Sequence, residues 1–335
     1  MYSAKDIAVI IPTKDRPELV KRLLQNLVEQ DCAIRRVIVV ASGLDIKDIV
    51  LSFANHLPVE YYKSEPGQIR QRNLGISLLD ESTKLVLALD DDILFLNNSI
   101  VEILNYWNTV EASTAGIGFN MITERKDNNF IKNIRNLFFQ KKKGRVSITG
   151  INIPIYDLSE NIQTQWLPGG FTIWRQKVLL EFPQSPLETS FAAGEDVRFS
   201  YPIGKKYNLY VCSNAKVTHD IIYDQKTNED IQYFRGYQDT LGIFHFTDSH
   251  QELSYHLAIV FTLFNSFFRL IYGIISFSIP KLKYAKGQFS AIIIALKAKW
   301  KKESIYFIWR RIIENKVALI DINPKSWVEV RLLSA

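Results

Sequence analysis

The chain has 335 residues, of which 47% are hydrophobic and 23% are charged. This composition supplies enough apolar side chains for a large core, so it argues against a disordered chain and allows one large α/β domain with an appendage. The net charge of +6 is modest and no nucleic-acid-binding motif is present. An anionic ligand or a membrane surface is therefore a better expected partner than nucleic acid.

The cysteines and the amino terminus bear on the compartment. Cys32 and Cys212 lack the spacing of a disulfide framework or of a thiolate metal site. Residues 1–6 show no pattern of basic, apolar and small residues typical of a secretory signal. We therefore expect a cytoplasmic, reducing environment.

The first third of the chain alternates between predicted strands and helices. Residues 7–12 are a continuous apolar run with β-branched side chains, typical of a strand covered on both faces. An amphipathic helix is predicted from Pro17 onward, then a strand over 36–40, a helix over 45–56 and a strand over 59–62. This alternation indicates a parallel sheet that binds its ligands at the carboxyl ends of its strands.

A turn and a further helix follow at residues 65–79. Pro66 and Gly67 predict the turn, and apolar residues at helical spacing predict the helix. Arg70 and Arg72 near its start are candidate donors to an anion, which free backbone N–H groups at a helix start also favour. The alternative is that both arginines lie on a solvated face.

The acidic residues Asp90, Asp91 and Asp92 stand between two apolar runs, residues 85–89 and 93–96. Carboxylates beside buried surface repel one another and lose solvation, so a divalent cation is the natural way to neutralise them. Oxygen ligands at a strand end suit Mg²⁺ or Mn²⁺, which also hold diphosphates. A solvated acidic turn or helix cap is the alternative, which the apolar flanks disfavour.

Taken together, these segments resemble the nucleotide-sugar half of the inverting GT-A glycosyltransferases of family 2. The resemblance covers about residues 7–219. Its motifs are Ile-Ile-Pro-Thr-x-x-Arg-Pro, Gly-Gln-x-x-x-Arg-Asn-Leu-Gly-Ile, Leu-Asp-Asp-Asp, Trp-Leu-Pro-Gly-Gly at 166–170, Gly-Glu-Asp at 194–196 and a last strand that ends in His219.

The resemblance implies a fold, a cofactor and roles for particular residues. The expected fold is α/β, with a Rossmann-like, mixed and mostly parallel GT-A sheet flanked by helices and a helical carboxyl-terminal region. Asp196 would be the general base, with Glu195 as the other catalytic candidate, and Asp92 and His219 would hold Mn²⁺ or Mg²⁺. The remaining implied positions are Pro12, Thr13, Asp15, Arg16, Ser42, Gln68, Arg72, Asp90 and Asp91 for the donor, and Trp166, Gly169 and Gly170 on the acceptor side.

Purely structural interpretations of the same residues stay open at this point. Glu195 and Asp196 also fit a pair of acids at a helix N-terminus, and His219 also fits a structural histidine at a strand end. The second strand departs from the family pattern, because no acid follows it until Asp45. Ser42 is then the candidate contact to the base, and the donor is open.

Residues 125–145 are rich in Lys, Arg and aromatic side chains and contain the single acid Asp127. Such a segment suits an anionic surface, and its place between the donor and acceptor motifs suits a lid or acceptor loop. A solvated loop is an equal alternative.

The carboxyl-terminal region is predicted to be helical. Residues 257–279 are long and apolar enough to span a bilayer, but a polar stripe containing Thr262, Ser266 and Arg269 favours a helix in an interface or in a helical subdomain. Residues 281–302 combine seven lysines with an apolar centre and a tryptophan, as membrane-surface helices do. A packed helix with solvated lysine ends is the alternative.

We thus expect a donor half at about residues 1–110, an acceptor half at about 111–222 and a helical, membrane-associating region at 223–335. The predicted enzyme moves a sugar from a nucleotide-sugar donor to a glycan or lipid-linked acceptor, as in polysaccharide biosynthesis. It would be peripheral at the inner face of the cell membrane, on anionic lipid, and an oligomer is possible. Two alternatives are a nucleotidyltransferase, for which the phosphate loop is missing, and a non-catalytic glycan-binding or scaffold protein.

Overall fold

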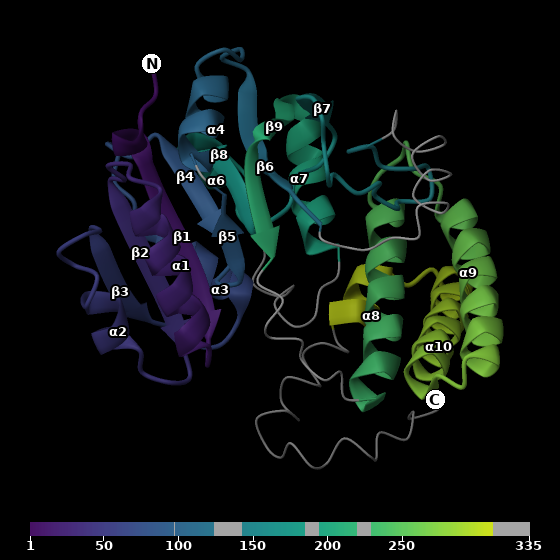
Figure 1. Ribbon diagram of the computed structural model, residues 1–335. Coiled ribbons are helices and arrows are strands. Elements are labelled where there is room, and N and C mark those ends of the chain that lie inside the picture. Colours follow the sequence, from purple (N-terminus) through teal and green to yellow (C-terminus); the bar gives the residue numbers. More distant parts are fainter. Residues whose placement is uncertain (97, 124–142, 185–193, 220–228, 311–335) are drawn as a thin grey trace. The chain divides into compact units, whose positions relative to one another are not determined.

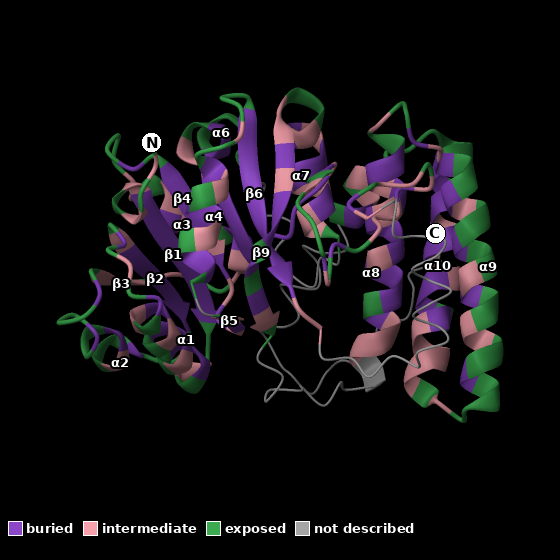
Figure 2. Cartoon of the chain, turned by 45° about the horizontal axis from the view of Figure 1, so that its top comes forward, coloured by how far each residue is buried: buried purple, intermediate pink, exposed green. Residues whose placement is uncertain are grey.

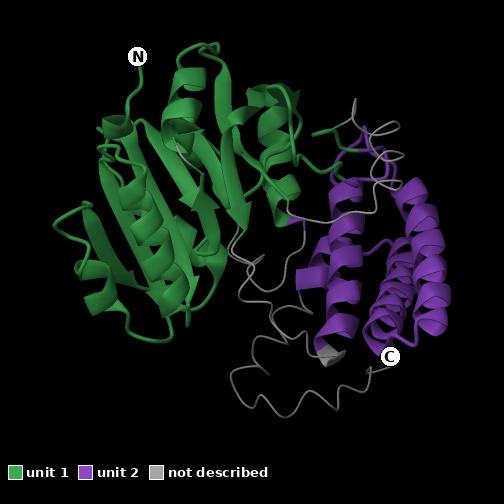
Figure 3. Cartoon of the chain, viewed as in Figure 1, with its two compact units in different colours: residues 1–146, 152–186, 195–224 green, residues 147–151, 187–194, 225–335 purple. Residues whose placement is uncertain are grey.

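The computed structural model describes residues 1–96, 98–123, 143–184, 194–219 and 229–310 (Figure 1). The chain divides into two compact units (Figure 3). Unit 1 consists of residues 1–146, 152–186 and 195–224, and unit 2 of residues 147–151, 187–194 and 225–335. Most of the basic segment at 125–145 lies outside the described residues. Its predicted role as a lid or acceptor loop therefore stays a prediction.

Within the described residues, unit 1 is an α/β structure built on one nine-stranded sheet. The strands are β1 (Ile7–Lys14), β2 (Arg36–Ser42), β3 (Val59–Lys63), β4 (Leu85–Leu89), β5 (Ile93–Phe95), β6 (Thr114–Met121), β7 (Ile162–Thr164), β8 (Phe171–Arg175) and β9 (Asn208–His219). The helices are η1 (Ala4–Asp6), α1 (Pro17–Glu29), α2 (Lys47–Leu51), α3 (Gln68–Ser77), α4 (Ser99–Trp107), α6 (Gln176–Glu181) and α7 (Glu195–Lys206).

The predicted strands and helices of the first third are present, with one correction. The helix expected over 45–56 ends at Leu51. Beyond it the backbone tightens into turns, because the N–H of Phe53 and of His56 bonds the carbonyl three residues earlier. Those turns bury Phe53 and Leu57 and lead the chain into β3.

The sheet has the order β3-β2-β1-β4-β8-β6-β9-β5, and β7 pairs with β9. β1, β2, β3, β4, β6 and β9 run in one direction, whereas β5, β7 and β8 run against them. The prediction of a mixed, mostly parallel sheet is therefore confirmed. Parallel strands need covering on both faces, which explains why their sequences are continuous apolar runs rather than alternating ones.

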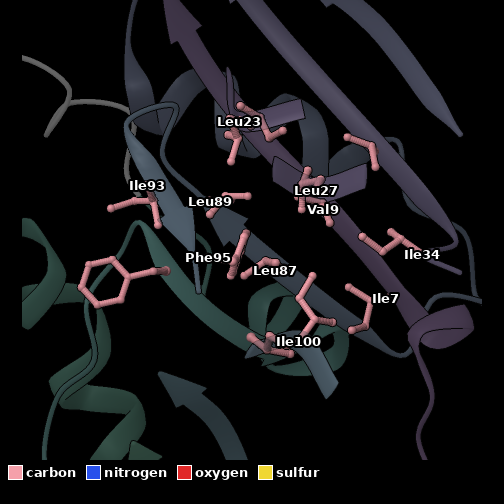
Figure 4. Packing of buried hydrophobic residues seen from close by; sticks show 14 of the residues in the cluster. Ile7, Val9, Leu23, Leu27, Ile34, Leu87, Leu89, Ile93, Phe95 and Ile100 are labelled. Carbon is pink, nitrogen blue, oxygen red and sulfur yellow. The ribbon is translucent and has the colours of Figure 1, made fainter. Parts of the chain in front are cut away.

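The core of unit 1 lies between the sheet and the helices that cover it. Figure 4 shows Leu23 and Leu27 of α1 against strand residues such as Val9, Leu87 and Leu89. All of these side chains are buried, as are all residues of β1 except Lys14 (Figure 2). Burial of each such side chain stabilises the fold by about 1.5–3 kcal/mol, so the sheet is a rigid support for the loops at its edge.

Strand direction brings the motifs to one edge of this sheet. The carboxyl ends of β1, β4 and β9 lie at that edge because the three strands run the same way. β5 and β8 run in the opposite direction, so their first residues, Ile93 and Phe171, lie there too. Residues 13–16, 90–92, 169–170 and 219 therefore converge, although they are far apart in the sequence.

The described part of unit 2 contains the helices α8 (Glu229–Asp248), α9 (Tyr255–Ile275) and α10 (Ile279–Lys301), and residues 305–310 are helical as well. α10 packs against α8 at Gly236 and Gly287, where a Cβ would collide with the backbone of the facing helix. The helices predicted at 257–279 and 281–302 are α9 and α10, and each begins and ends within a few residues of its predicted position. In the described part of the chain, α9 is the helix long and apolar enough, by length and composition, to cross a membrane.

Candidate active site

Asp90 is fixed between the sheet and α3. Its backbone N–H donates to Gly170 O at 2.9 Å, which continues the antiparallel pairing of β4 with β8. Its carboxylate accepts hydrogen bonds from Gln68 Nε2 at 2.7 Å and from Arg72 Nη2 at 2.6 Å. Two predicted donor-binding residues of α3 thus meet the first acid of the turn.

Asp91 joins the acidic turn to the loop after β1. It is buried, and it accepts a hydrogen bond from Thr13 Oγ1 at 2.6 Å. It also forms an ion pair with Arg16, in which Nη1 lies 3.0 Å from Asp91 Oδ1. Burial raises the pKa of its carboxyl to about 6, against the opposing effects of Thr13 and Arg16. With these partners, Asp91 acts chiefly to hold two loops of the site together.

Asp92 lies beside His219 because of strand register. Ile93 of β5 pairs directly with His219 of β9, so the residue before Ile93 reaches the imidazole, with Asp92 Oδ2 at 3.5 Å from Nε2. Burial raises the pKa of the Asp92 carboxyl, and the charge of Asp90 adds to this. Arg16 Nη1 also approaches Asp92, at 3.4 Å.

The pair of Asp92 and His219 fits a divalent ion that also has other ligands. In the described residues no three His, Cys, Asp or Glu side chains gather closely enough to hold a metal alone. One carboxylate and one imidazole leave the other positions for phosphate oxygens and water, as is usual for ions that bind with a diphosphate. A nitrogen ligand suits Mn²⁺ better than Mg²⁺, which prefers oxygen.

Arg72 connects the acidic turn to the start of α7. Its side chain is 5% exposed, and Nη1 lies 3.6 Å from Glu195 Oε1 while Nη2 bonds Asp90. Arg70, the other candidate on this helix, is exposed, so the predicted solvated face applies to Arg70 alone. A buried arginine with carboxylates on two sides orients those carboxylates, because its planar fork fixes the directions of its N–H groups.

Gly169 and Gly170 allow the carboxylates to lie against the backbone. A Cβ at Gly169 would overlap Asp196 Oδ1 and one at Gly170 would overlap Asp90 Oδ2. Thr172 holds this loop by donating its hydroxyl to Pro168 O at 2.6 Å. The absence of a side chain at Gly169 and Gly170 therefore leaves room for the carboxylates of Asp196 and Asp90.

Glu195 and Asp196 begin α7, as the helix-cap interpretation also expected. Burial raises the pKa of Glu195 to about 8, outweighing the attraction of Arg72, and the neighbouring Asp196 charge raises it further. Burial also raises the pKa of Asp196, while Arg72 and a hydrogen bond from the Gly169 N–H oppose that rise. The Glu195 carboxyl therefore keeps a proton near neutral pH, and the Asp196 carboxyl binds a proton more readily than an ordinary aspartate does, which suits a group that accepts one.

Other predicted residues lie in supporting positions. Pro12 is buried within β1, and Asp15 accepts a hydrogen bond from the Leu44 N–H at 2.8 Å, which fixes the loop after β2. Trp166 is buried and donates its indole N–H to Ile153 O. Ser42 Oγ is buried with no hydrogen-bond partner among the described residues, which leaves it available to a ligand.

Gln71 is a site residue that the sequence interpretation missed. Its side-chain amide donates to Thr13 O and to Val40 O, both at 2.7 Å, and so ties the ends of β1 and β2 to α3. The available signal was a polar residue placed between Arg70 and Arg72, which periodicity alone does not mark as buried.

The comparisons with known proteins decide the family. The family model for glycosyl transferase family 2 matches residues 8–179, just over half of the chain. The chain belongs to this family. The predicted family is therefore confirmed, and the protein is a glycosyltransferase. The comparison with curated proteins gives no match.

Solved structures of other glycosyltransferases share this fold. The mannosyltransferase PcManGT from Pyrobaculum calidifontis, in complex with GDP-Man and Mn²⁺, superposes with a TM-score of 0.54 at 15% identity, covering 96% of this chain and 88% of that chain. GalNAc-T7 with UDP, GalNAc and Mn²⁺ gives a TM-score of 0.50 at 14% identity, covering 74% of this chain and 51% of that chain. At such identities the likeness shows the GT-A fold, which confirms the predicted fold class.

Proposed function

We propose that this glycosyltransferase moves a sugar, with inversion at the anomeric carbon, from a nucleotide-sugar donor to a hydroxyl of a glycan or lipid-linked acceptor. The observation that carries the proposal is the arrangement around Arg72. This buried guanidinium contacts Asp90 and Glu195, and it lies close enough to influence the pKa of Asp196. Beside that group, Asp92 and His219 form a pair suited to Mn²⁺ or Mg²⁺.

Asp196 is proposed as the base. Its carboxylate lies against the Gly169 backbone, a position supported by the hydrogen bond from that N–H. In the reaction, the base takes the proton of the acceptor hydroxyl while the hydroxyl oxygen bonds to the anomeric carbon. The bond from that carbon to the donor phosphate breaks, and its electrons leave with the nucleoside diphosphate. A direct displacement of this kind inverts the configuration.

Glu195 is the reserve candidate for the base. Its Oε1 lies 3.6 Å from Arg72, and its role is proposed as fixing that arginine while the charges of the site change. Thr13 and Arg16 would position the donor diphosphate. Gln68 and Asp90 would contact the donor sugar or nucleoside. A divalent ion, when bound, would neutralise the diphosphate as negative charge develops on it.

The place of action is proposed to be the cytoplasmic face of the cell membrane, consistent with a role in polysaccharide biosynthesis. Support comes from α10, which carries six lysines, with the seventh of residues 281–302 at its C-cap, Lys302. Ile293, Leu296 and Trp300 of this helix are exposed, whereas Ile292 is buried. The predicted apolar centre is thus partly used for packing, which leaves the lysines as the main contribution of α10 to the attraction to anionic lipid.

The proposed chemistry is tested first by donor binding. Thermal unfolding is measured with a panel of nucleotide sugars, with and without Mn²⁺, because a ligand of the native state raises the apparent stability. We expect one donor to raise the melting temperature in the presence of Mn²⁺. No shift with any donor would favour the scaffold interpretation instead.

The base is tested with Asp196→Asn, and Asp48→Asn serves as an exposed control acid at the start of α2. We expect Asp196→Asn to lower turnover about a hundredfold to ten-thousandfold with donor affinity retained, since a base acts on the acceptor. The control variant keeps full turnover. Transfer by Asp196→Asn near the wild-type rate would move the role to Glu195, and a product of retained anomeric configuration would overturn inversion.

A further inference from the structure

The burial pattern of α9 is the reverse of that of an ordinary helix in a water-soluble bundle, because its small and polar face is buried and its large apolar side chains are exposed. The members of its small and polar stripe that are buried are Thr262, Ser266 and Gly273. Its large apolar side chains point outward instead, so α9 is mostly exposed along its length in Figure 2. Those exposed side chains on α9 and the turn after it are Leu257, Val260, Phe261, Leu263, Phe264, Phe267, Phe268, Ile271, Tyr272, Ile274, Ile275, Phe277 and Ile279.

Ser266 and Arg269 on the inner face of α9 contact neighbours within unit 2, although Arg269 Nε has no hydrogen-bond partner among the described residues. Ser266 Oγ donates to the Thr262 carbonyl at 2.7 Å, and the Arg269 guanidinium lies 4.1 Å from the centre of the Tyr284 ring of α10. On α10 the buried positions are mostly small, namely Ala285, Gly287, Ala291, Ala295 and Ala298 together with Gln288 and Ile292. Small residues inside and large apolar residues outside are typical of helices that pack in contact with lipid.

The size of the exposed surface calls for a partner. An aromatic or large aliphatic side chain that is half exposed presents about 100 Å². The thirteen exposed side chains therefore add up to roughly 1,300 Å², whereas the largest apolar patch of a typical monomer is about 300–600 Å². Left in water, an apolar surface of this size is unfavourable.

Charge indicates the nature of that partner. Residues 253–302 contain no Asp or Glu, and they contain Arg269 and the seven lysines of residues 281–302. The exposed part of α9 itself has His256, in the first turn, as its only ionisable side chain apart from Tyr272. Near the end of α9, Lys281 lies over the Tyr272 ring at 3.9 Å, and near its start Lys299 lies over the Tyr255 ring at 4.6 Å. Uncharged hydrocarbon with lysines beside both helix ends matches acyl chains beneath anionic headgroups.

We propose that α9 lies in the plane of a membrane surface, with its exposed apolar side chains among the acyl chains and the lysines of α10 at anionic headgroups. This deepens, and rests on, the membrane location proposed above, and it moves the main contact from α10 to α9. Binding then has a salt-sensitive part from the lysines and a salt-insensitive part from α9.

Two other occupants fit the structure less well. A span would need α10 to return across the bilayer, but α10 carries Lys283, Lys286 and Gln288 within its first half, and among the described helices only α9 meets the criteria for a span. A second copy of the chain would form an interface of aromatic and polar residues with a polar rim. From Leu257 to Leu270, α9 exposes large apolar side chains, and its polar side chains there are buried or half-buried.

The test is co-sedimentation of the full chain with vesicles of phosphatidylcholine, with and without phosphatidylglycerol, at low and high salt. The variant of α9 is Phe264→Gln, Phe267→Gln and Phe268→Gln combined, since these rings are exposed and their loss leaves the fold intact. Its matched control is Leu51→Gln with Leu180→Gln, two exposed leucines of unit 1. The lysine variant is Lys286→Gln, Lys297→Gln and Lys301→Gln combined.

We expect the α9 variant to bind anionic vesicles at least tenfold more weakly at high salt, and the control to bind like wild type. The lysine variant loses its preference for phosphatidylglycerol but keeps the salt-insensitive part. Unchanged binding by the α9 variant would overturn the proposal, even if the lysine variant showed that the membrane location itself is right.

Three further measurements separate the alternatives. Retention in the membrane after an alkaline carbonate wash would indicate a span and overturn the in-plane orientation. A lipid-free dimer that dissociates in the α9 variant, with vesicle binding unaffected, would assign this surface to a second copy. Donor binding is expected to be equal in all variants, so a failure of the proposed chemistry is recognised independently.

Discussion

At the scale of single residues, the site depends on acids whose neighbours differ although they are adjacent in sequence. Asp90 contacts α3, Asp91 contacts the loop after β1, and Asp92 contacts the end of β9. Each carboxylate therefore has different contacts, and each substitution is expected to have a different effect.

Asp92→Asn is expected to abolish metal-dependent donor binding while the fold is kept. The change removes a proposed metal ligand and also relieves repulsion with Asp90, which contributes to the raised pKa of Asp92. Calorimetric titration of the nucleoside diphosphate with Mn²⁺ checks this. Unchanged Mn²⁺-dependent binding would show that Asp92 does not hold the ion.

Glu195→Gln is expected to reduce the loss of stability with rising pH. The pKa of Glu195 is about 8 in the folded chain and near its ordinary value of 4.5 when unfolded, so the folded state holds the extra proton between these values. Stability therefore falls as the pH rises through this window, by about 1.4 kcal/mol for each pKa unit of difference between the states. Gln cannot ionise, so this part of the fall disappears.

The measurement is urea unfolding between pH 5 and pH 8 without metal. Part of the fall remains in the variant, because the pKa of Asp196 is also raised. Identical pH profiles for wild type and variant would mean that Glu195 is ionised in the folded chain throughout this range.

At the scale of elements, α3 is positioned by a close approach to β1. A Cβ at Gly75 would lie 2.5 Å from Ile10 Cγ2, and Ile10 is fully buried. This approach places Gln68, Gln71 and Arg72 at the edge of the sheet. The glycine of the Asn-Leu-Gly motif is thus explained by packing rather than by a turn.

Gly75→Ala is accordingly expected to destabilise the protein. Alanine favours a helix by up to about 1 kcal/mol over glycine, but overpacking a filled core costs about 1–3 kcal/mol. We expect a net loss of about 1–2 kcal/mol in denaturant unfolding, with weaker donor binding. Ser77→Ala, exposed on the same helix, should change stability by less than about 0.5 kcal/mol; a stabilised Gly75→Ala would show that Ile10 moves aside freely.

At the scale of the whole molecule, the candidate site residues all belong to unit 1 and the helices α8, α9 and α10 to unit 2. The predicted boundary at residue 222 stays a prediction, and a shortened chain tests it. A chain ending at residue 224 is expected to bind the donor and Mn²⁺ with affinity within about threefold of the full chain, while its vesicle binding is lost. Thermal shift and co-sedimentation measure the two properties separately.

A shortened chain that folds but binds no donor would place part of the donor site in unit 2. If it also bound vesicles, the membrane contact would have to lie in unit 1, and both proposals about the carboxyl-terminal helices would be wrong.

The sequence by itself determined the local structure and the order of the motifs. Continuous apolar runs such as residues 7–12 predict buried parallel strands, and proline, glycine and the acids mark the turns between them, because these signals act over a few neighbouring residues. The alternation of strands and helices predicted a parallel sheet, and the family resemblance added its mixed GT-A form and the roles of the site residues.

Only the tertiary structure decided which groups meet and which faces point inward. Arg72 was an expected anion ligand, but strand order places it between Asp90 and Glu195, residues far away in the chain. Likewise, periodicity shows that Thr262 and Ser266 share one face of α9. It does not show that this face is the buried one, because that depends on where α8 and α10 pack against α9. In the structure the small and polar residues of α9 face inward, and its large apolar side chains stay outside.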